Sequence, residues 1–572
     1  MQIVTPKQMS IIEERSEQLG VSKKQLMENA GKALAGLIDD YCRKESTAPP
    51  EDMSVVILAG KGNNGGDGYA AANILVYRGY KITIINVGGQ PESDLAKEMF
   101  LRLPREHIRF IDGCRSKNVE AAIEAAELSY MSSSDNDDIS ELEKKQNRNP
   151  LENILLNERK RMQKVKKAIV GADVLVDCVY GTGFHGQLDK NIASVFTIGT
   201  GAYRISADVP SGGNCVTGTV SQGIFKADET IVFGYIKTGI SQFPLKKYCG
   251  RVTIADIGIP SEAIGSIRDE RQYFRIERNH LAAFPSKRER DSHKGNFGTV
   301  LVIAGSSSMR GAASFAALGA LRTGAGLVRV ASVEKCINSV SILVPEATYI
   351  EMDCDDYGFM LYEPNREAIL KAMTEADAIL IGCGIGVSQD TVELTKFVTA
   401  NAKCPVIIDA DGINCIANDI DILTKKKTDV VITPHGGEMA RLLGCETKFI
   451  AENRIIAAEK YAEKYGITVV LKGAGTVVAN NIFTAVNHTG NPGMSCGGSG
   501  DVLAGIIASI IAQGGDVFDN VCAGVYIHGL AGDAAAAKLG MEAMLPRDII
   551  DNLSDSFRIL KEKKASMNCF DN

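Results

Sequence analysis

Apolar runs of strand length alternate along this chain with segments whose apolar residues recur at helical spacing. In the first half these runs are VVILAG, KITIINVGG, ADVLVDCVYGTG and AYRISADVPSGG, which begin at residues 55, 81, 172 and 202. Each run ends in a glycine-containing turn, and a helical pattern follows. This order is typical of parallel βαβ units, so the first half is predicted to form an α/β fold.

The second half repeats the pattern with more continuous apolar runs. They are TVLVIAG, AILIGCGIG, PVIIDADG, VVITPHGGE and TVVLKGAGT, which begin at residues 299, 378, 405, 430 and 468. Nearly unbroken apolar runs are expected of strands covered on both faces. Open α/β sheets bind ligands at the carboxyl ends of their strands, so the glycine-rich segments that follow these runs are candidate sites.

The chain is too long for one ordinary hydrophobic core, since it has 572 residues. We expect two domains, residues 1–273 and 274–572. The charged stretch 268–295 is interpreted as a connector and the entry to the second domain. Residues 131–166 are polar and rich in both charges, which predicts a partly helical surface insertion or a mobile loop.

Composition narrows the class of protein. The net charge of −7 argues against a nucleic-acid binder that relies on a basic face. The 14 cysteines include no CxxC pair, as expected of reduced thiols in a cytosolic protein. The first 20 residues lack the apolar core of a signal peptide, and the longest apolar runs are far shorter than the ~20 residues that a membrane span needs. We therefore expect a cytoplasmic protein without a membrane segment.

The first candidate site follows the run at residue 55. Gly60, Gly62 and Gly65 match GxGxxG, but the next strand runs into GGQPE without the acidic residue that a dinucleotide fold uses to hold a ribose. The P-loop pattern GxxxxGK[ST] is absent. What remains is NNGGDG, residues 63–68, whose backbone N–H groups at a helix start could hold an anion. The alternative is a turn in which asparagine makes only local hydrogen bonds.

Two aspartates lie near the ends of buried strands, Asp177 and Asp208. Either one alone could simply cap the turn that follows it. Together with the segments GTGFHGQ and PSG they favour a shared cleft. Carboxylate, amide and hydroxyl oxygens there could hold a hard cation, although the residues do not identify the ion.

These motifs together resemble the NAD(P)H-hydrate epimerase family. The resemblance is carried by QLMENAG (25–31), GKGNNGGDG (60–68), VDCVYGTG (176–183) and SADVPSGGNCVTG (206–218). It implies a Rossmann-like α/β/α sandwich that equilibrates the R and S forms of hydrated nicotinamide cofactors with K⁺ in the site. It also implies that Asn64, Asp177 and Ser211 coordinate K⁺, and that Asp208 contacts the substrate near the reacting carbon and shuttles protons as a catalytic residue. The implied substrate-binding residues are Asn63, Asn64, Gly65, Gly66, Asp67, Gly181, Thr182, Gly183, Phe184, His185, Gly186, Gln187 and Asp208.

The second candidate site lies in NPGMSCGGSGDVLAGIIASIIAQ, residues 491–513. Glycines lead directly into an apolar run that is predicted to form a buried helix, and Asp501 stands at the junction. Unpaired N–H groups and the helix dipole attract anions to such a junction. A carboxylate there is either a helix cap or a base that waits for a proton.

The second half resembles the ribokinase-like superfamily and, more closely, the ADP- or ATP-dependent NAD(P)H-hydrate dehydratases. The resemblance implies a ribokinase-like α/β/α sandwich in which Asp501 removes a proton from the substrate hydroxyl. Gly498, Ser499 and Gly500 would steady the developing negative charge. The motifs are SHKGNFGTVLVIAGS (292–306), RGAASFAALGALRTGAGLVRV (310–330), GCGIG (382–386), DADGIN (409–414), TPHGGEMARLLG (433–444), KGAGTVV (472–478) and NPGMSCGGSGDVLAG (491–505).

The same resemblance assigns binding residues in the second half. Ala312, Gly386, His435 and Asp501 would contact the hydrate. Gly384 is an alternative to Gly386, and His435 could instead be a structural turn histidine. The nucleotide-binding residues would be Lys472, Gly473, Ala474, Gly475, Thr476 and Gly500.

Both resemblances together imply a bifunctional repair enzyme for NADHX and NADPHX that uses a nucleotide. ADP is expected ahead of ATP because fused members of the family are typically bacterial and use ADP. Mg²⁺ is expected for the dehydratase, and the protein is expected to be a homo-oligomer. One alternative is a ribokinase-like small-molecule kinase fused to a hydrate-binding domain. Another is a binding module similar to a domain of an mRNA-decapping scaffold, although the acidic net charge weakens an RNA-binding role.

Overall fold

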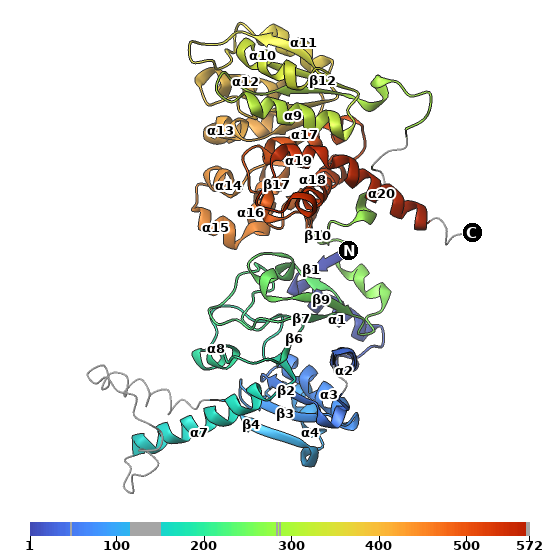
Figure 1. Ribbon diagram of the computed structural model, residues 1–572, viewed down its shortest axis with the longest axis vertical. Coiled ribbons are helices and arrows are strands. Elements are labelled where there is room, and N and C mark those ends of the chain that lie inside the picture. The colour runs from blue at the N-terminus through green and yellow to red at the C-terminus, as the bar shows by residue number, and fades with distance from the viewer. Residues whose placement is uncertain (46–47, 115–149, 282–283, 285–287, 568–572) are drawn as a thin grey trace. The chain divides into compact units, whose positions relative to one another are not determined.

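The computed structural model describes residues 1–45, 48–114, 150–281, 284 and 288–567. The chain forms two compact units, Ile3–Asp269 and Glu270–Asn572, the second of which also includes Met1 and Gln2. Each unit contains a largely parallel sheet covered by helices (Figure 1), so the predicted α/β class is confirmed.

The N-terminal unit is built on a seven-stranded sheet with the order β4-β3-β2-β5-β6-β7-β9, in which every neighbouring pair is parallel. The four strands predicted from glycine-ended runs are present as β2, β3, β5 and β6. A separate short pair joins β1 (Gln2–Val4) to β8 (Ile236–Lys237). The strands of the main sheet are β2 (Ser54–Ala59), β3 (Lys81–Asn86), β4 (Ile108–Asp112), β5 (Val174–Cys178), β6 (Tyr203–Ala207), β7 (Glu229–Phe233) and β9 (Arg251–Ala255).

Helices cover both faces of this sheet. Val55 and Ile57 of β2 face a core built with α2 and α3, while Val56 and Leu58 face a core built with α7 and α8. This alternation is what a buried strand requires. The helices are α1 (Pro6–Gln18), α2 (Lys23–Glu45), α3 (Asn63–Tyr77), α4 (Asp94–Leu101), α7 (Pro150–Val170) and α8 (Lys190–Phe196).

The predicted polar insertion at 131–166 falls partly on α7. Residues 150–166 belong to this helix, whose later part buries Val165 and Ile169 against the sheet. The C-terminal end of the helix is therefore part of the core. Residues 131–149 lie outside the described residues.

In the C-terminal unit the strand order is β13-β12-β11-β14-β15-β16-β17-β18-β19-β10. The pairs from β13 to β17 are parallel, and β18 is antiparallel to both of its neighbours. The five predicted strands are β11, β14, β15, β16 and β17. The strands are β10 (Gln272–Arg275), β11 (Thr299–Ile303), β12 (Leu327–Val333), β13 (Thr348–Met352), β14 (Ala378–Ile381), β15 (Val406–Ile408), β16 (Val430–Ile432), β17 (Thr468–Leu471), β18 (Val477–Ala479) and β19 (Phe483–Val486). The charged stretch 268–295 is thus more than a connector, because β10 pairs with β19.

The helix that carries Asp501, α17 (Ser499–Ala512), is buried along its length between α9 and α18. Two glycines allow this packing: a Cβ at Gly505 would lie 2.1 Å from the carbonyl oxygen of Ala316, and one at Gly319 would lie 2.7 Å from that of Val502. The backbones of α9 and α17 therefore touch. The helices are α9 (Arg310–Thr323), α10 (Glu334–Leu343), α11 (Arg366–Thr374), α12 (Gln389–Asn401), α13 (Asp411–Ile416), α14 (Gly436–Leu443), α15 (Thr447–Glu452), α16 (Arg454–Tyr465), α17, α18 (Val517–Leu539), α19 (Pro546–Asp551) and α20 (Leu553–Met567).

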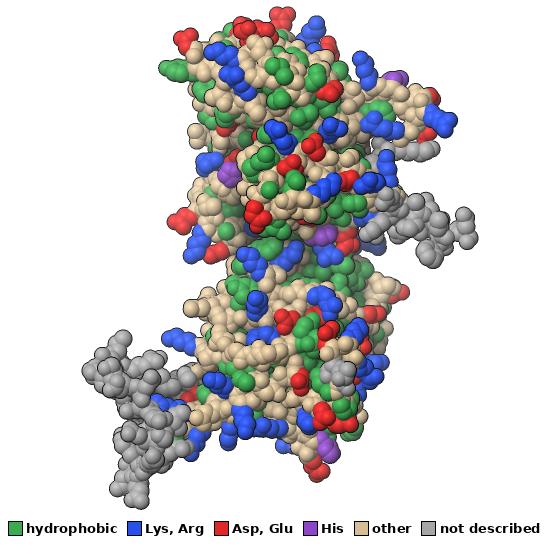
Figure 2. All heavy atoms as spheres, in the orientation of Figure 1, with side chains coloured by type: hydrophobic (Ala, Val, Ile, Leu, Met, Phe, Trp, Pro, Cys, Tyr) green, Lys and Arg blue, Asp and Glu red, His purple; other side chains and the backbone are tan. Residues whose placement is uncertain are grey.

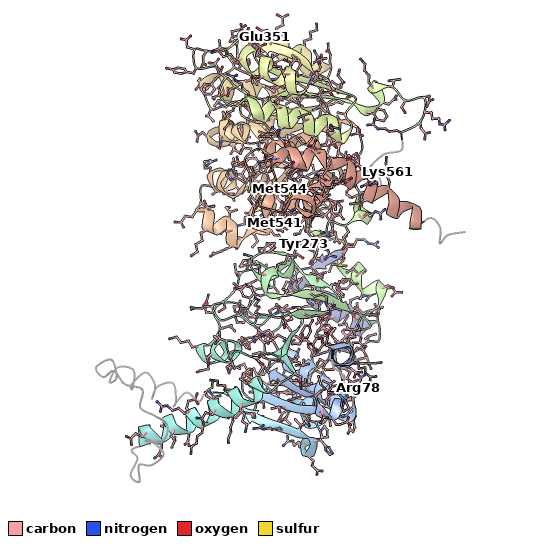
Figure 3. The ribbon with its side chains drawn as sticks, in the orientation of Figure 1. Arg78, Tyr273, Glu351, Met541, Met544 and Lys561 are labelled. Carbon is pink, nitrogen blue, oxygen red and sulfur yellow. The ribbon has the colours of Figure 1, made fainter. Side chains whose placement is uncertain are left out.

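Charged side chains of both signs are interspersed over the visible surface of each unit (Figure 2). Some tie helices together: Arg78, labelled in Figure 3, follows α3 and donates to Asp39 of α2 at 3.2 Å. Among the described residues, none of the helices combines the length and the apolar character that crossing a bilayer requires.

Candidate active sites

The first site is built where the β2–α3 turn meets the loop that follows β5. A Cβ at Gly60 would lie 2.0 Å from the carbonyl oxygen of Val179, and one at Gly65 would lie 2.1 Å from that of Gly60. Only glycine permits such close backbone approach. Gly60 and Gly65 are therefore explained by packing, and they place the start of α3, residues 63–67, against the end of β5.

Of the three residues predicted to hold K⁺, Asn64 and Ser211 contact Tyr180, and Asp177 contacts Ser211. Asn64 Nδ2 donates to the Tyr180 carbonyl oxygen at 3.0 Å, and Ser211 Oγ lies 3.2 Å from the same oxygen. Ser211 also donates to Asp177, from Oγ at 2.6 Å and from its backbone N–H at 2.7 Å. The Asp177 carboxylate, the Ser211 hydroxyl and the Tyr180 carbonyl oxygen thus lie together, with the Asn64 side chain beside them, and such oxygens suit a hard monovalent cation.

Asp177 is the charged member of this group and is fully buried. Burial raises the pKa of its carboxyl to about 6, although hydrogen bonds from Ser211, Val179 and Ser206 favour the ionised form. A cation beside this carboxylate would offset the cost of burying its charge. The residues present therefore fit K⁺.

Asp208 follows β6 in an unusual backbone conformation, with a φ of +65°. Its Oδ1 accepts a hydrogen bond from Lys237 Nζ at 2.5 Å and from the Phe233 N–H at 3.4 Å. Lys237 was not among the predicted site residues. The available signal was a lysine at the end of the otherwise apolar run TIVFGYIK, where a charge is unexpected unless it has a partner.

The other predicted residues of the first site lie in two places. Asp67 is the fifth residue of α3, where burial and then the charge of Asp208 raise the pKa of its carboxyl. Residues 181–187 belong to the loop after β5. A Cβ at Gly181 would lie 3.6 Å from Asn64 Cβ, and Phe184 packs on Tyr180 with ring centroids 5.1 Å apart. Asn63 and the end of this loop, His185 to Gln187, are exposed.

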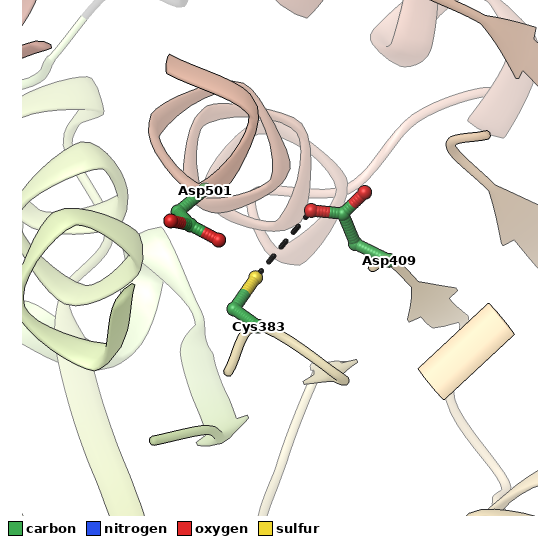
Figure 4. Close-up of side chains that lie close together, drawn as sticks. All are labelled: Cys383, Asp409 and Asp501. Atoms are coloured by element: carbon green, nitrogen blue, oxygen red, sulfur yellow. Dashed lines mark hydrogen bonds between the residues drawn. The ribbon is translucent and has the colours of Figure 1, made fainter. Parts of the chain in front are cut away.

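The second site lies where four parallel strands end at the start of α17. Cys383 follows β14 and Asp409 follows β15, and a thiol or carboxylate atom of each lies within 4.8 Å of a carboxylate oxygen of Asp501 (Figure 4). Thr433, after β16, donates to Asp409 Oδ1 at 2.5 Å, and Lys472, after β17, donates to the same oxygen at 2.6 Å. This is the edge at which open α/β sheets bind ligands.

The N-cap of α17 is Gly498, with a φ of +103°, and no side chain caps the helix there. Asp501 lies in the first helical turn instead. It is therefore not the helix cap, which was one of its two predicted roles. Burial, followed by the charge of Asp409, raises the pKa of Asp501 to about 7. A carboxyl with a pKa near neutral is suited to take and return a proton. Burial also raises the pKa of the Cys383 thiol.

The predicted nucleotide loop lies beside this helix start. A Cβ at Gly500 would lie 3.3 Å from Lys472 Nζ, so the ammonium is next to the first turn of α17. Residues 473–476 connect β17 to β18. Arg454 was not among the predicted site residues. It donates to the carbonyl oxygens of Leu471 at 2.8 Å and Lys472 at 3.2 Å and so holds the start of this loop in place.

The predicted hydrate contacts are spread around the same edge. A Cβ at Gly384 would lie 2.8 Å from Ala312 Cβ, whereas one at Gly386 would lie 2.2 Å from the Phe359 ring, so Gly384 is the one beside Ala312. His435 is the N-cap of α14, and its Nδ1 accepts from the Gly437 N–H at 3.0 Å. The turn-histidine interpretation therefore has a structural basis, while 55% of the His435 side chain stays exposed.

The group Cys383, Asp409 and Asp501 does not fit Mg²⁺ as an ion held by the protein alone. Mg²⁺ prefers oxygen ligands, and one of the three is a thiol. The ammonium of Lys472 already compensates Asp409.

The N-terminal unit has a group of oxygen ligands, and the C-terminal unit has a carboxyl of near-neutral pKa at a glycine-rich helix start. These features define an enzyme with two separate sites. Comparison with known proteins agrees with this class. Residues 23–239 match the family described as YjeF-related protein N-terminus, and residues 300–555 match the NAD(P)H-hydrate dehydratase family.

Curated relatives extend over nearly the whole chain. A bifunctional NAD(P)H-hydrate repair enzyme of Moorella thermoacetica is 33% identical and covers 94% of this chain and 93% of its own length. One of Escherichia coli is 30% identical over 94% of this chain and 90% of its own length. The chain belongs to the family of bifunctional NAD(P)H-hydrate repair enzymes. A solved ADP/ATP-dependent NAD(P)H-hydrate dehydratase of Bacillus subtilis is 29% identical and covers 50% of this chain and 98% of its own, with a TM-score of 0.43.

Proposed function

We propose that the N-terminal unit interconverts the R and S forms of NADHX and NADPHX, and that the C-terminal unit dehydrates the S form to NADH or NADPH at the expense of ADP or ATP. The observation that carries the proposal is the pair of sites, each with a carboxylate at the carboxyl end of a parallel sheet, in a chain of this family. One unit supplies the stereoisomer that the other consumes.

In the first site, Asp208 is the proposed proton shuttle. The reacting carbon of the hydrate bears both a ring nitrogen and a hydroxyl, so loss of the hydroxyl as water leaves an iminium ion. Water can then add to either face, and one proton is released as the C–O bond forms. A positioned carboxylate can deliver the first proton and accept the second. Residues 63–67 and 181–187 would bind the hydrate around it.

K⁺ is the cation proposed for the cradle of Asn64, Asp177 and Ser211. When bound it supplies positive charge beside the substrate site. The residues themselves orient the β2–α3 turn against the loop after β5 through the hydrogen bonds to Tyr180. We therefore propose that this group sets the position of the substrate rather than taking part in the proton transfers.

In the second site, Asp501 is the proposed base. It takes the proton of the substrate hydroxyl as the oxygen attacks the terminal phosphate of the nucleotide, and the bond from that phosphorus to its bridging oxygen breaks. The lone pair of the ring nitrogen then expels phosphate, and loss of a proton from the neighbouring ring carbon restores the dihydronicotinamide. N–H groups at the start of α17, with Lys472, would stabilise the transferring phosphoryl group.

The test supplies a mixture of the R and S hydrates with ADP or ATP and K⁺, and follows the recovery of reduced cofactor by ultraviolet absorbance. The wild-type chain is expected to convert the whole mixture. Asp208→Asn is expected to convert only the S half at the normal rate, and Asp501→Ala to convert none while still binding substrate. Accumulation of a stable phosphorylated product would instead identify a kinase, and failure with both nucleotides would refute the proposal.

A further inference from the structure

Lys237 is among the largest fully buried side chains of the chain. Its Nζ donates to Asp208 Oδ1 at 2.5 Å and to the Phe233 carbonyl oxygen at 3.1 Å. An isolated buried ammonium is costly, so a lysine stays charged in the interior only beside a compensating anion. Here the acid in direct contact is Asp208, the residue assigned to the proton shuttle.

The surroundings of this pair are acidic. Glu13 of α1 and Asp67 of α3 both interact with the Lys237 and Asp208 charges, and burial raises the pKa of each of the two carboxyls. Burial likewise raises the pKa of the nearby Cys215 thiol, and the charge of Asp208 adds to that shift. Lys237 is thus the cationic side chain in contact with Asp208 within an otherwise acidic group.

The hydrogen bonds also fix which oxygen of Asp208 is available. Within the described residues, the hydrogen bonds to this carboxylate come from Lys237 Nζ and the Phe233 N–H, and both reach Oδ1. The backbone is held by the bond from the Asp208 N–H to the Ile231 carbonyl oxygen at 2.7 Å. A φ of +65° is unfavourable for a residue other than glycine, and such strain is kept where the surroundings fix it. Oδ2 is the oxygen left to exchange a proton.

We propose that Lys237 is a positioning residue of the epimerisation: its ammonium binds Oδ1 and fixes the orientation of Asp208, so that Oδ2 is left to exchange protons with the substrate and the attacking water. The inference rests on the proposed function of the N-terminal unit. A stabilising role alone does not account for the pair, because replacing a buried ion pair by apolar residues is often neutral or stabilising.

The test compares Lys237→Met, Lys237→Arg, Asp208→Asn and the double variant Lys237→Met/Asp208→Asn, with exposed Lys226→Met as the matched control. The rate of R-to-S conversion is measured over a range of substrate concentrations. Lys237→Met is expected to lower kcat by roughly 10²-fold or more with KM changed by less than about 3-fold, since the loss falls on the transition state. Lys237→Arg, which keeps the charge, is expected to recover part of the loss.

The double variant separates positioning from structure. If Lys237 acts only through Asp208, the double variant is expected to be no slower than Asp208→Asn alone. This comparison does not require Lys237→Met itself to fold, because the double variant leaves no unpaired charge. Dehydration of the pure S form by the C-terminal unit reports the amount of intact chain in every sample.

Three results would overturn the inference. They are a wild-type epimerisation rate in Lys237→Met, a loss in that variant that appears only in KM, and a double variant slower than Asp208→Asn by a further large factor. A wild-type chain that dehydrates the S form but never converts the R form would instead refute the proposed function of the first unit, so the two failures are distinguishable.

Discussion

Lys472 Nζ lies 2.6 Å from Oδ1 of Asp409, and the two side chains come from loops that follow different strands, β17 and β15. The pair joins the predicted nucleotide loop to the strand end that faces Asp501. Asp409 thereby touches two parts of the second site: its partner Lys472 stands at the start of α17, and its negative charge raises the pKa of Asp501.

Replacing Asp409 by asparagine should change both the rate and the pH dependence of dehydration. Lys472 loses its charged partner, so we expect roughly a 10-fold loss of kcat/KM. The pKa of Asp501 should fall because a neighbouring negative charge is gone, which moves the acid limb of the pH profile to lower pH. Steady-state rates between pH 5 and 9 would measure this, with exposed Asp421→Asn as the control. An acid limb that stays in place would contradict the assignment.

The wild-type pH profile should itself report Asp501. A base must be ionised to accept a proton, and burial raises the pKa of this carboxyl to about 7. We therefore expect kcat/KM for dehydration to fall as the pH drops through about 7, and Asp501→Asn to lose roughly 10²–10⁴-fold at pH 8 and to lack this fall at acid pH. A variant with wild-type activity would exclude Asp501 as the base.

Asp501→Asn should also make the C-terminal unit more stable at alkaline pH. Because the pKa of Asp501 is raised from 3.8 to about 7 on folding, its contribution to stability is complete below the lower value and is lost as the pH rises through the higher one. Asparagine does not titrate, so the variant should gain roughly 1–3 kcal/mol over the wild type at pH 8 and less at pH 5. Urea unfolding at the two pH values would measure the difference in stability between the variant and the wild type. A difference in favour of the variant that is larger at pH 5 would contradict the raised pKa of Asp501.

K⁺ should stabilise the N-terminal unit more at pH 8 than at pH 5. The pKa of Asp177 is about 6, so the carboxylate that would bind the cation is ionised only above that pH. Thermal unfolding in K⁺ is compared with unfolding in a large organic cation at the same ionic strength. Asp177→Asn should abolish the difference, whereas exposed Asp269→Asn should preserve it. Equal stabilisation at both pH values would argue against this cation site.

Gly505→Ala should separate α9 from α17. The added methyl group would meet the Ala316 carbonyl oxygen at 2.1 Å, a backbone contact that cannot rotate away. We expect a loss of about 1–3 kcal/mol in the free energy of unfolding and a weaker dehydratase, because the start of α17 moves. Gly311→Ala, at a helical position of α9 with open space around it, is the matched control and should change stability by less than about 0.5 kcal/mol. Similar losses in the two variants would show that contact with α9 is not the cause.

The strands that the sequence predicted correctly are those whose apolar runs end in glycine-rich turns. The missed strands have other signatures. In β12, LVRVASV, the arginine interrupts the run, and β13 is an edge strand of mixed polarity. Single-sequence patterns are weakest at such edges, because their exposed faces need not be apolar.

The candidate sites likewise contain residues that the sequence predicted and residues that it did not. Motifs contiguous in sequence, such as NNGGDG and GGSGD, were recognisable from local turn chemistry. Cys383 and Asp409 were assigned to the site only when strand ends far apart in sequence were brought together, and the local signal for Lys237 did not identify its partner. Lys237 contacts Asp208 across 29 positions, and Lys472 contacts Asp409 across 63. No local pattern encodes such contacts, since they depend on sheet order.

The left-handed conformation of Asp208 also restricts how relatives of this enzyme can diverge. Besides aspartate, the residues that occupy such a torsion most readily are asparagine, histidine and glycine. Asparagine and glycine cannot carry a proton, so a relative with either of them at position 208 would lack the proposed proton shuttle. Residue 208 thus offers a marker for sorting such relatives from the sequence alone.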